Sequence, residues 1–274
     1  MIARGVKPET ATRSTRKTAG MATERLVQVR DMTFRVHTTS RPGAVRAFVL
    51  VHGIGISHRA FARLHDVLAE EHTVHSLDMP GFDDLPEPER SPDVHEMASL
   101  LGEVVAGIGE QPVVVVGNSM GTQWAVELGV QRPDLVSHVV AVGPVVDDRH
   151  RSALRQGMSL GLDCLRETPA TDLMVLTDYA RCGPRWYARQ LPHMLAYPME
   201  ERAGALERPL LVVRGGRDPI AGLRWCRRLR DAAPRARLVE MPGHPHLVQH
   251  TAPRAVASAL QDFLATETAW LPAT

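Results

Sequence analysis

Short runs of apolar residues, bounded by glycine, proline or polar loops, recur along this 274-residue chain. The run Val113–Val116 is too short for a helix and too apolar for a surface, so it indicates a strand buried on both faces. Ala47–Val51, Val139–Val142 and Leu210–Val213 have the same character. Fully buried strands of this kind are typical of a parallel sheet covered on both sides.

Helical patterns separate these strands. The periodic segments are 60–70, 94–108, 122–131, 223–232 and 253–266. Further strands are expected at 73–77 and 237–241, and an antiparallel edge hairpin is expected at 26–30 and 32–36. Strands that alternate with helices predict an α/β fold, with a mostly parallel sheet and helices on both faces.

The alternation breaks after Pro144 and resumes at Leu210. Between these points the pattern shows no buried strand, and prolines divide a helical segment that is rich in methionine, tyrosine and tryptophan. We therefore expect a helical lid, or cap, at residues 145–206, inserted into an α/β core formed by residues 25–144 and 207–274.

The N-terminal segment is basic and rich in threonine and serine, so residues 1–24 are predicted to be a disordered tail, with Met21 as an alternative start. The chain has no apolar run near the ~18 residues that span a bilayer. Three cysteines without CxxC spacing favour a reducing, cytoplasmic setting. The net charge of +1 argues against nucleic acid or an anionic membrane as the main partner. A small-molecule substrate is expected instead.

The run Val113–Val116 continues into Gly117-Asn118-Ser119-Met120-Gly121 and then into a helical pattern. A Gly-x-Ser-x-Gly turn between a strand and a helix is a nucleophile elbow, where flanking side chains would collide. The serine then projects from the carboxyl edge of the sheet, at a helix N-terminus that favours a developing oxyanion. The competing interpretation is a glycine-flanked turn with an incidental serine.

A serine nucleophile needs a base, and the base needs an acid to orient it. On such a sheet the chain order is serine, acid, histidine. Asp218 follows the strand Leu210–Val213 and is the expected acid, with Asp148 as the alternative. His244 and His246 both follow the strand at 237–241, and both are candidates for the base.

The oxyanion hole needs two backbone N–H groups. One is expected from Met120, directly after the nucleophile. The other is expected from Ile54, in the glycine-rich loop after the strand Ala47–Val51, with Gly55 as the alternative. His52 is expected to bond within its own loop rather than to act as a second base.

Together these motifs resemble the α/β-hydrolase superfamily over residues 25–144 and 207–266. The loop 52–55, the segment 78–82, the elbow, Asp218 and the histidine loop carry the likeness. In that superfamily a proline usually opens the last helix seven positions after the histidine, and counting back from Pro253 selects His246. Where members commonly read Gly-Phe-Gly-x-Ser, this chain has Gly-Phe-Asp-Asp-Leu at 81–85, which alters the cavity wall and leaves the triad intact.

The elbow sequence is similar to that of carbon–carbon bond hydrolases acting on ring-cleavage products, and it also occurs among esterases. A serine there argues against the epoxide hydrolase and haloalkane dehalogenase branches, whose elbow residue is an aspartate. The leading prediction is therefore a serine hydrolase of a small or medium, apolar carboxylic ester, acting through an acyl-enzyme. The chemistry requires no metal or organic cofactor.

Three alternatives remain open at this stage. One is hydrolysis of a carbon–carbon bond in a keto acid, in which Arg181, Arg185 or Arg189 grips the carboxylate; solvated surface charge is the competing role of each arginine. The second is hydrolysis of a lactone or a thioester. The third, outside enzymes, is a catalytically silent ligand-binding member of the fold.

Overall fold

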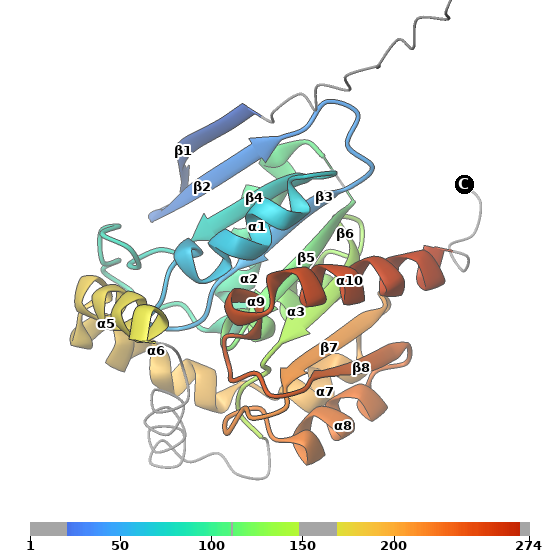
Figure 1. The fold of residues 1–274 in the computed structure, drawn as a ribbon. Coiled ribbons are helices and arrows are strands. Elements are labelled where there is room, and N and C mark those ends of the chain that lie inside the picture. Colours follow the sequence, from blue (N-terminus) through green and yellow to red (C-terminus); the bar gives the residue numbers. More distant parts are fainter. Residues whose placement is uncertain (1–20, 111, 148–168, 269–274) are drawn as a thin grey trace, which may run out of the picture.

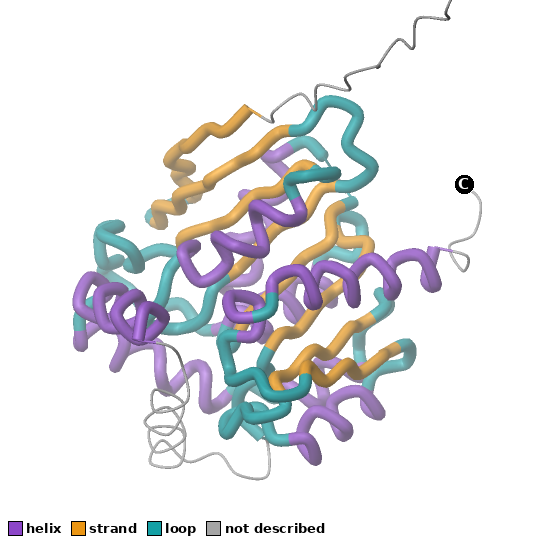
Figure 2. Tube along the Cα trace, in the orientation of Figure 1, coloured by secondary structure: helices purple, strands orange, loops and turns teal. Residues whose placement is uncertain are grey.

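The computed structural model describes residues 21–110, 112–147 and 169–268. Within these residues, strands form one sheet of eight, with helices packed on both faces (Figures 1 and 2). The strands are β1 (Met21–Val29), β2 (Met32–Ser40), β3 (Ala47–Val51), β4 (Thr73–Asp78), β5 (Val113–Asn118), β6 (Val136–Val142), β7 (Leu210–Gly215) and β8 (Ala236–Met241).

Helices follow most of the strands, as the sequence pattern predicts. They are η1 (His58–Phe61, a 3₁₀ turn), α1 (Ala62–Leu68), α2 (Val94–Ile108), α3 (Gly121–Gln131), α5 (Pro169–Cys182), α6 (Pro184–Ala196), α7 (Met199–Gly204), α8 (Leu223–Ala232), α9 (Val248–Thr251) and α10 (Pro253–Thr268).

The strand order is β1-β2-β4-β3-β5-β6-β7-β8. β1, β2 and β4 pair in antiparallel fashion, and the other neighbours are parallel. The chain leaves β3 for β4 on one side and then returns to place β5 on the other side of β3. Loops after two such strands diverge, and ligands of open α/β sheets bind in the crevice between them.

Alternate residues of the central strands face opposite layers. Phe48 and Leu50 pack in one hydrophobic core with α1 and α10, whereas Val49 and Val51 pack in the other with α2, α3 and α8. All four side chains are fully buried. This two-sided burial explains why the strand is a continuous apolar run, and it confirms the predicted fold class.

The predicted edge hairpin is present, but it is longer than the pattern indicated. β1 begins at Met21, so the prediction of a disordered tail through residue 24 is wrong for 21–24. These residues pair in register with β2, Met21 opposite Ser40. They are exposed, so the apolar pattern could not reveal them, and backbone hydrogen bonds hold them. Residues 1–20 lie outside the described part of the chain.

The helices α5, α6 and α7 connect β6 to β7, in the segment for which a helical insertion was predicted. Of that segment, residues 148–168 lie outside the described ranges. α5 and α6 lie beyond the ends toward which the parallel strands point, at the left of Figure 1. Among the described helices, none is both long enough and apolar enough to cross a membrane.

Candidate active site

The tight turn after β5 holds Ser119 in a left-handed backbone conformation, with φ of 54°. Such an angle is strained for a residue with a side chain and is typical of functional turns. The turn closes because glycines flank it. A Cβ on Gly117 would lie 2.2 Å from the carbonyl oxygen of Gly121, and one on Gly121 would lie 2.2 Å from that of Val51. Ser119 therefore lies at the carboxyl end of β5, directly before α3.

The loop after β3 crosses directly over Ser119. A Cβ on Gly53 would lie 2.6 Å from Cβ and 3.2 Å from Oγ of Ser119. Ile54 is the next residue, and Gly55 follows with φ of 79°. The structure thus brings the predicted loop donors beside the elbow, where Met120 caps the N-terminus of α3. The loop after β3 and the N-terminus of α3 therefore both lie beside Ser119.

Asp218 and His246 come together although 28 residues separate them. Asp218 follows β7, His246 follows β8, and Nδ1 of His246 lies 2.8 Å from Oδ2 of Asp218. The other oxygen of Asp218 accepts hydrogen bonds from the backbone N–H groups of Ile220, at 2.7 Å, and Ala221, at 2.9 Å. Both oxygens are therefore engaged, and the carboxylate is fixed in orientation.

Asp218 is only 4% exposed, and that burial by itself would raise its pKa. The adjacent His246 and the N–H groups of Ile220 and Ala221 outweigh burial, so the pKa of Asp218 lies below its ordinary value. The carboxyl group is ionised at neutral pH and can stabilise an imidazolium at His246.

One peptide of β6 connects the elbow to the histidine. The N–H of Ser119 donates to the carbonyl oxygen of Val142 at 3.1 Å. The next residue, Gly143, has no side chain, and a Cβ there would lie 2.8 Å from Cε1 of His246. Ser119 and His246 are thus both packed against the end of β6. The nucleophile, acid and base candidates follow β5, β7 and β8, at the same edge of the sheet, and β6 lies between β5 and β7.

The structure also locates two of the other residues considered from the sequence, His244 and His52. Nδ1 of His244 lies 3.1 Å from the hydroxyl of Thr251, and the structure pairs His246, not His244, with Asp218. Asp148, the alternative acid, lies outside the described residues. His52 bonds within its own loop as expected, with Nδ1 2.7 Å from the carbonyl oxygen of Gly53, and its Nε2 accepts the N–H of Met79.

The sequence profile of the alpha/beta hydrolase family matches residues 48–259. The chain belongs to this family. A curated relative is the (E)-2-((N-methylformamido)methylene)succinate hydrolase of Acinetobacter baylyi, 24% identical over 82% of this chain and 92% of its own length. Another is the pimeloyl acyl-carrier-protein methyl ester esterase of Neisseria meningitidis, 26% identical over 82% and 95%. The solved enol-lactonase of Burkholderia xenovorans superimposes with a TM-score of 0.76 at 17% identity, covering 88% of this chain and all of that one.

The structure explains one departure from the family's motifs. Asp83, where a glycine is common, has φ of 46°, and Asp84 has φ of 61°. Both therefore adopt the left-handed conformation that glycine favours and that aspartate tolerates better than most other residues. The Asp83 carboxylate has compensating partners, because it lies 2.9 Å from Arg35 of β2 and 2.9 Å from Arg181 of α5.

All three arginines considered as carboxylate ligands have acidic partners in the loop after β4. Arg181 pairs with Asp83, whereas Arg185 lies 3.4 Å and Arg189 lies 2.8 Å from Glu87. Arg189 also bonds to backbone carbonyls of the loop and stacks on Trp186. Through these ion pairs the three arginines join α5 and α6 to the loop after β4.

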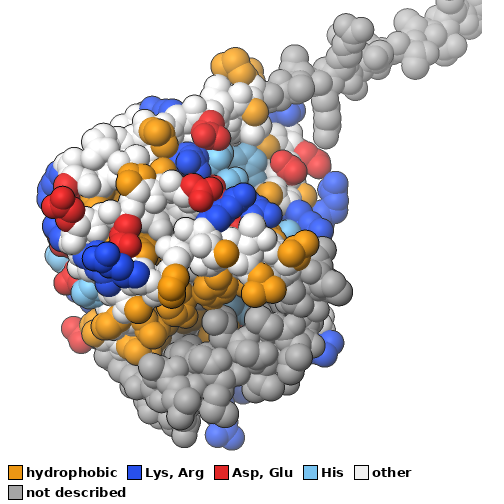
Figure 3. Space-filling model, turned by 90° about the vertical axis from the view of Figure 1, so that its left-hand side faces the viewer, with side chains coloured by type: hydrophobic (Ala, Val, Ile, Leu, Met, Phe, Trp, Pro, Cys, Tyr) orange, Lys and Arg blue, Asp and Glu red, His pale blue; other side chains and the backbone are white. Residues whose placement is uncertain are grey.

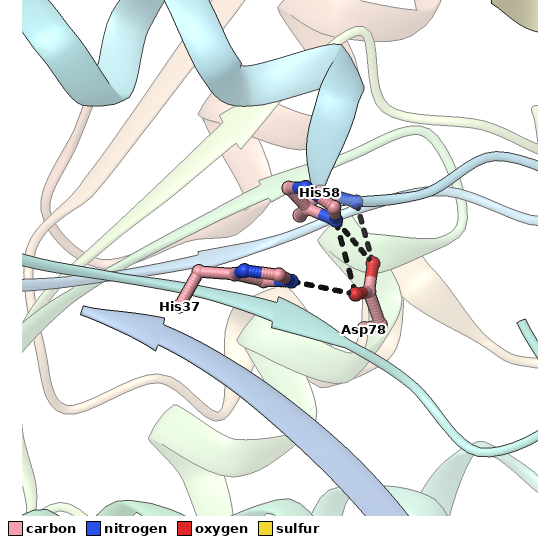
Figure 4. A group of neighbouring side chains, drawn as sticks. All are labelled: His37, His58 and Asp78. Atoms are coloured by element: carbon pink, nitrogen blue, oxygen red, sulfur yellow. Dashed lines mark hydrogen bonds and ion pairs between the residues drawn. The ribbon is translucent and has the colours of Figure 1, made fainter. Parts of the chain in front are cut away.

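One cluster of possible metal ligands lies among the described residues: His37, His58 and Asp78, whose donor atoms are all within 4.8 Å of one another. Both imidazoles face the carboxylate of Asp78, with N···O distances of 2.9 Å (Figure 4). The rings are stacked, with centroids 3.7 Å apart and planes 27° apart. Stacked rings direct their nitrogen lone pairs side by side instead of toward one ion. The cluster fits N–H donation to a carboxylate better than metal ligation.

Charges around this cluster shift its protonation. Burial lowers the pKa of His58, but the hydrogen bond and charge of Asp78, with further charge from Asp83 and Asp178, outweigh it and raise the pKa. Burial opposes ionisation of Asp78, and the hydrogen bonds from His37 and His58 reverse this, so its pKa is strongly lowered. The charged forms of His58 and Asp78 thus stabilise each other, and the hydrogen bonds of the cluster join β2, η1 and β4.

A separate cavity of about 390 Å³ lies between α2, α3, α6 and α7. Its buried carboxylate, Glu127, accepts hydrogen bonds from Arg202, Tyr197, His95 and Gln131. These partners come from α2, from α3 itself, from α7 and from the turn between α6 and α7. Glu127 therefore holds these helices together, and its acceptor capacity is used by the protein itself.

Proposed function

We propose that the protein is a serine hydrolase that cleaves a small or medium, apolar carboxylic ester. Ser119 is the nucleophile, His246 the base and Asp218 the acid that orients the base. The backbone N–H groups of Met120 and Ile54 form the oxyanion hole. The observation that carries the proposal is the His246–Asp218 hydrogen bond, at the sheet edge where Ser119 has a strained backbone angle.

The reaction follows from these roles. Oγ of Ser119 attacks the carbonyl carbon while Nε2 of His246 takes the hydroxyl proton, and the carbonyl oxygen becomes an oxyanion. His246 then gives the proton to the departing alcohol oxygen as the ester C–O bond breaks, leaving an acyl-enzyme. Water attacks the acyl carbon and transfers its proton to His246. Collapse of the second tetrahedral intermediate returns the proton to Ser119 and releases the acid.

Orientation of the base makes this sequence possible. With Nδ1–H donated to Asp218, the second nitrogen of the neutral imidazole carries a lone pair and can accept a proton. The ionised carboxylate of Asp218 then stabilises the imidazolium that forms. The short distance from Gly53 to Ser119 supports Ile54 as the second oxyanion donor, because the loop backbone lies against the nucleophile.

An apolar ester is favoured over a keto acid because of the arginine partners. A substrate carboxylate needs a cationic partner in a dry site. Arg181, Arg185 and Arg189 are engaged by Asp83 and Glu87, and a carboxylate would have to displace these. A methyl ester esterase among the relatives is consistent with the ester assignment.

The test measures initial rates on p-nitrophenyl esters of increasing acyl length, for the wild type and Ser119→Ala in parallel. We expect turnover that falls by at least about 10³-fold in the variant, and the best acyl length reports the size of the cavity. A vinylogous keto acid, a lactone and a thioester are assayed beside the esters. Wild-type turnover that survives in Ser119→Ala, or a faster rate on the keto acid than on every ester, would contradict the proposal.

Two histidines two positions apart supply a matched control. His246→Asn removes the proposed base, whereas His244→Asn removes a side chain that contacts Thr251. A fluorophosphonate probe should label the wild type and His244→Asn at similar rates, and His246→Asn far more slowly. Wild-type protein that the probe never labels would favour a silent ligand-binding member of the fold.

A further inference from the structure

Asp178 is a carboxylate of α5 that is 1% exposed and belongs to no part of the proposed triad. Its Oδ2 accepts two hydrogen bonds from Ser57, one from the backbone N–H at 3.1 Å and one from the hydroxyl at 2.7 Å. Its Oδ1 accepts from Arg59 at 2.7 Å. A buried carboxylate with both oxygens engaged by one loop fixes that loop to its own helix.

That loop is the one proposed to carry an oxyanion donor. Ser57 lies three residues after Ile54, and residues 54–57 are all buried. The rest of the fold fixes the loop at both ends. His52 bonds Gly53 and Met79 at its start, and the N–H of His58 donates to Asp78 at its end. Between these ends, Ser57 is held by Asp178, which lies on α5 and therefore outside the sheet and its covering helices.

The same helix packs on the loop with apolar side chains. A Cβ on Gly55 would lie 2.3 Å from Cε1 of Tyr179, so the tyrosine ring rests directly on the glycine backbone. One turn before Asp178, Met174 forms a buried cluster with Ile56, Ala60 and Leu247, the last of which follows the proposed base. α5 therefore contacts both the oxyanion loop and the histidine loop.

A second charged contact lies one turn along the helix. Arg181 pairs with Asp83, so α5 gives a carboxylate to the loop after β3 and a guanidinium to the loop after β4. On the face toward α5 and α6, acidic and basic side chains lie beside one another above a group of hydrophobic side chains (Figure 3). Because the charges at these two contacts are of opposite sense on α5, the two ion pairs together favour one position of α5 over the loops.

We infer that Asp178 is a positioning residue, which holds the oxyanion loop in its working place by anchoring it to α5. The inference rests on the proposed function. It makes oxyanion stabilisation depend on the docking of a helix between β6 and β7 whose Tyr179 covers the loop, so that α5 contributes to the rate. A displacement of the Ile54 N–H by a fraction of an ångström weakens a preorganised donor.

The test compares Asp178→Ala with the wild type by ester kinetics, at a temperature well below both unfolding midpoints. We expect kcat to fall by roughly tenfold or more, with KM changed by less than about threefold, because a donor acting on the transition state affects kcat. Fluorophosphonate labelling of Ser119 should slow in parallel. Asp178→Asn keeps an oxygen for Ser57 and should restore most of kcat.

Leu176→Ala is the matched control on the same helix, at a position that is 66% exposed, and its kcat should stay at the wild-type value. Ser57→Ala combined with Asp178→Ala should be no slower than Asp178→Ala alone, because both changes remove the same contact. If Asp178→Ala does not fold, the other two variants test the inference. Asp178→Asn should keep most of kcat, and Ser57→Ala should lower kcat.

Folded Asp178→Ala with kcat within twofold of the wild type would overturn the inference, as would Asp178→Asn as slow as Asp178→Ala. Either result leaves the proposed function intact if Ser119→Ala is inactive. Turnover that is independent of Ser119 would instead contradict the proposed function, whatever the behaviour of Asp178.

Discussion

The imidazole of His246 lies 2.8 Å from the carboxylate of Asp218, although the two residues belong to loops after different strands. β7 and β8 are parallel neighbours, so their carboxyl ends meet at one edge of the sheet. Gly215 permits the loops to meet closely, since a Cβ there would lie 2.1 Å from the carbonyl oxygen of Pro245. Of the two candidate histidines, His246 is the one that pairs with Asp218.

Asp218→Asn should lower kcat on the best ester by on the order of 10³–10⁴-fold with little change in fold. An amide accepts hydrogen bonds through one atom only, and the N–H groups of Ile220 and Ala221 already claim that acceptor. The amide NH₂ would then face His246 and favour the wrong tautomer. Steady-state kinetics with circular dichroism checks this. An Asp218→Asn variant with wild-type kcat would contradict the assignment of Asp218 as the acid and would favour Asp148.

Gly121→Ala should destabilise the protein by at least about 3 kcal/mol. A methyl group there would lie 2.2 Å from the backbone oxygen of Val51, and a backbone atom in a central strand cannot move aside. Gly107→Ala is the control, because no atom lies within 4 Å of its Cβ position in α2. It should instead stabilise the helix by about 0.5–1 kcal/mol. Urea unfolding of both variants gives the comparison, and equal effects would contradict the close packing at the elbow.

Asp83→Ala should be less stable than Asp83→Gly by about 1 kcal/mol. Both variants lose the ion pairs with Arg35 and Arg181, but alanine retains the strain of φ at 46° and glycine does not. Asp84→Gly is the control, because Asp84 has a similar φ of 61° and a side chain that is 67% exposed. It should be neutral or stabilising. Thermal unfolding midpoints rank the three, and equal midpoints for Asp83→Ala and Asp83→Gly would show that strain is not stored there.

Two neighbouring histidines should change stability with pH in opposite directions. The pKa of His58 is raised above 6.5 in the folded state, so its stabilisation is complete below pH 6.5 and is lost as pH rises through the folded pKa. Burial lowers the pKa of His65 to about 4, so its contribution is complete above pH 6.5 and is lost as pH falls toward 4.

Unfolding free energies of His58→Gln and His65→Gln between pH 4 and 9 test both signs. The difference from the wild type should shrink above pH 6.5 for His58→Gln, and below pH 6.5 for His65→Gln. Asp78, Asp83 and His37 contact His58 and are unchanged in its variant, so the difference isolates one side chain. Differences that are flat with pH would contradict the assigned protonation states.

Sequence alone determined the class of fold and the tight turn in which Ser119 lies. A strand buried on both faces must be apolar throughout, so Val113–Val116 can be recognised from the local sequence. A tight turn must have glycine where side chains would collide, so Gly117 can be recognised in the same way. The order Ser119, Asp218, His246 also follows from the chain, because each residue comes directly after a strand that its own pattern predicts.

Only the tertiary structure decided the contacts between distant segments. These contacts are the pairing of His246 with Asp218, the ion pair of Arg181 and the hydrogen bonds of Asp178, and each depends on which segments meet at the sheet edge. Asp178 could have been noticed only as an aspartate four residues after Met174 on a buried helical face. Local patterns encode burial and turn geometry, whereas a polar side chain's partner is set by the packing of elements far apart in sequence. The physical reason is that a hydrogen bond needs both groups within about 3 Å, and only the folded chain fixes that distance.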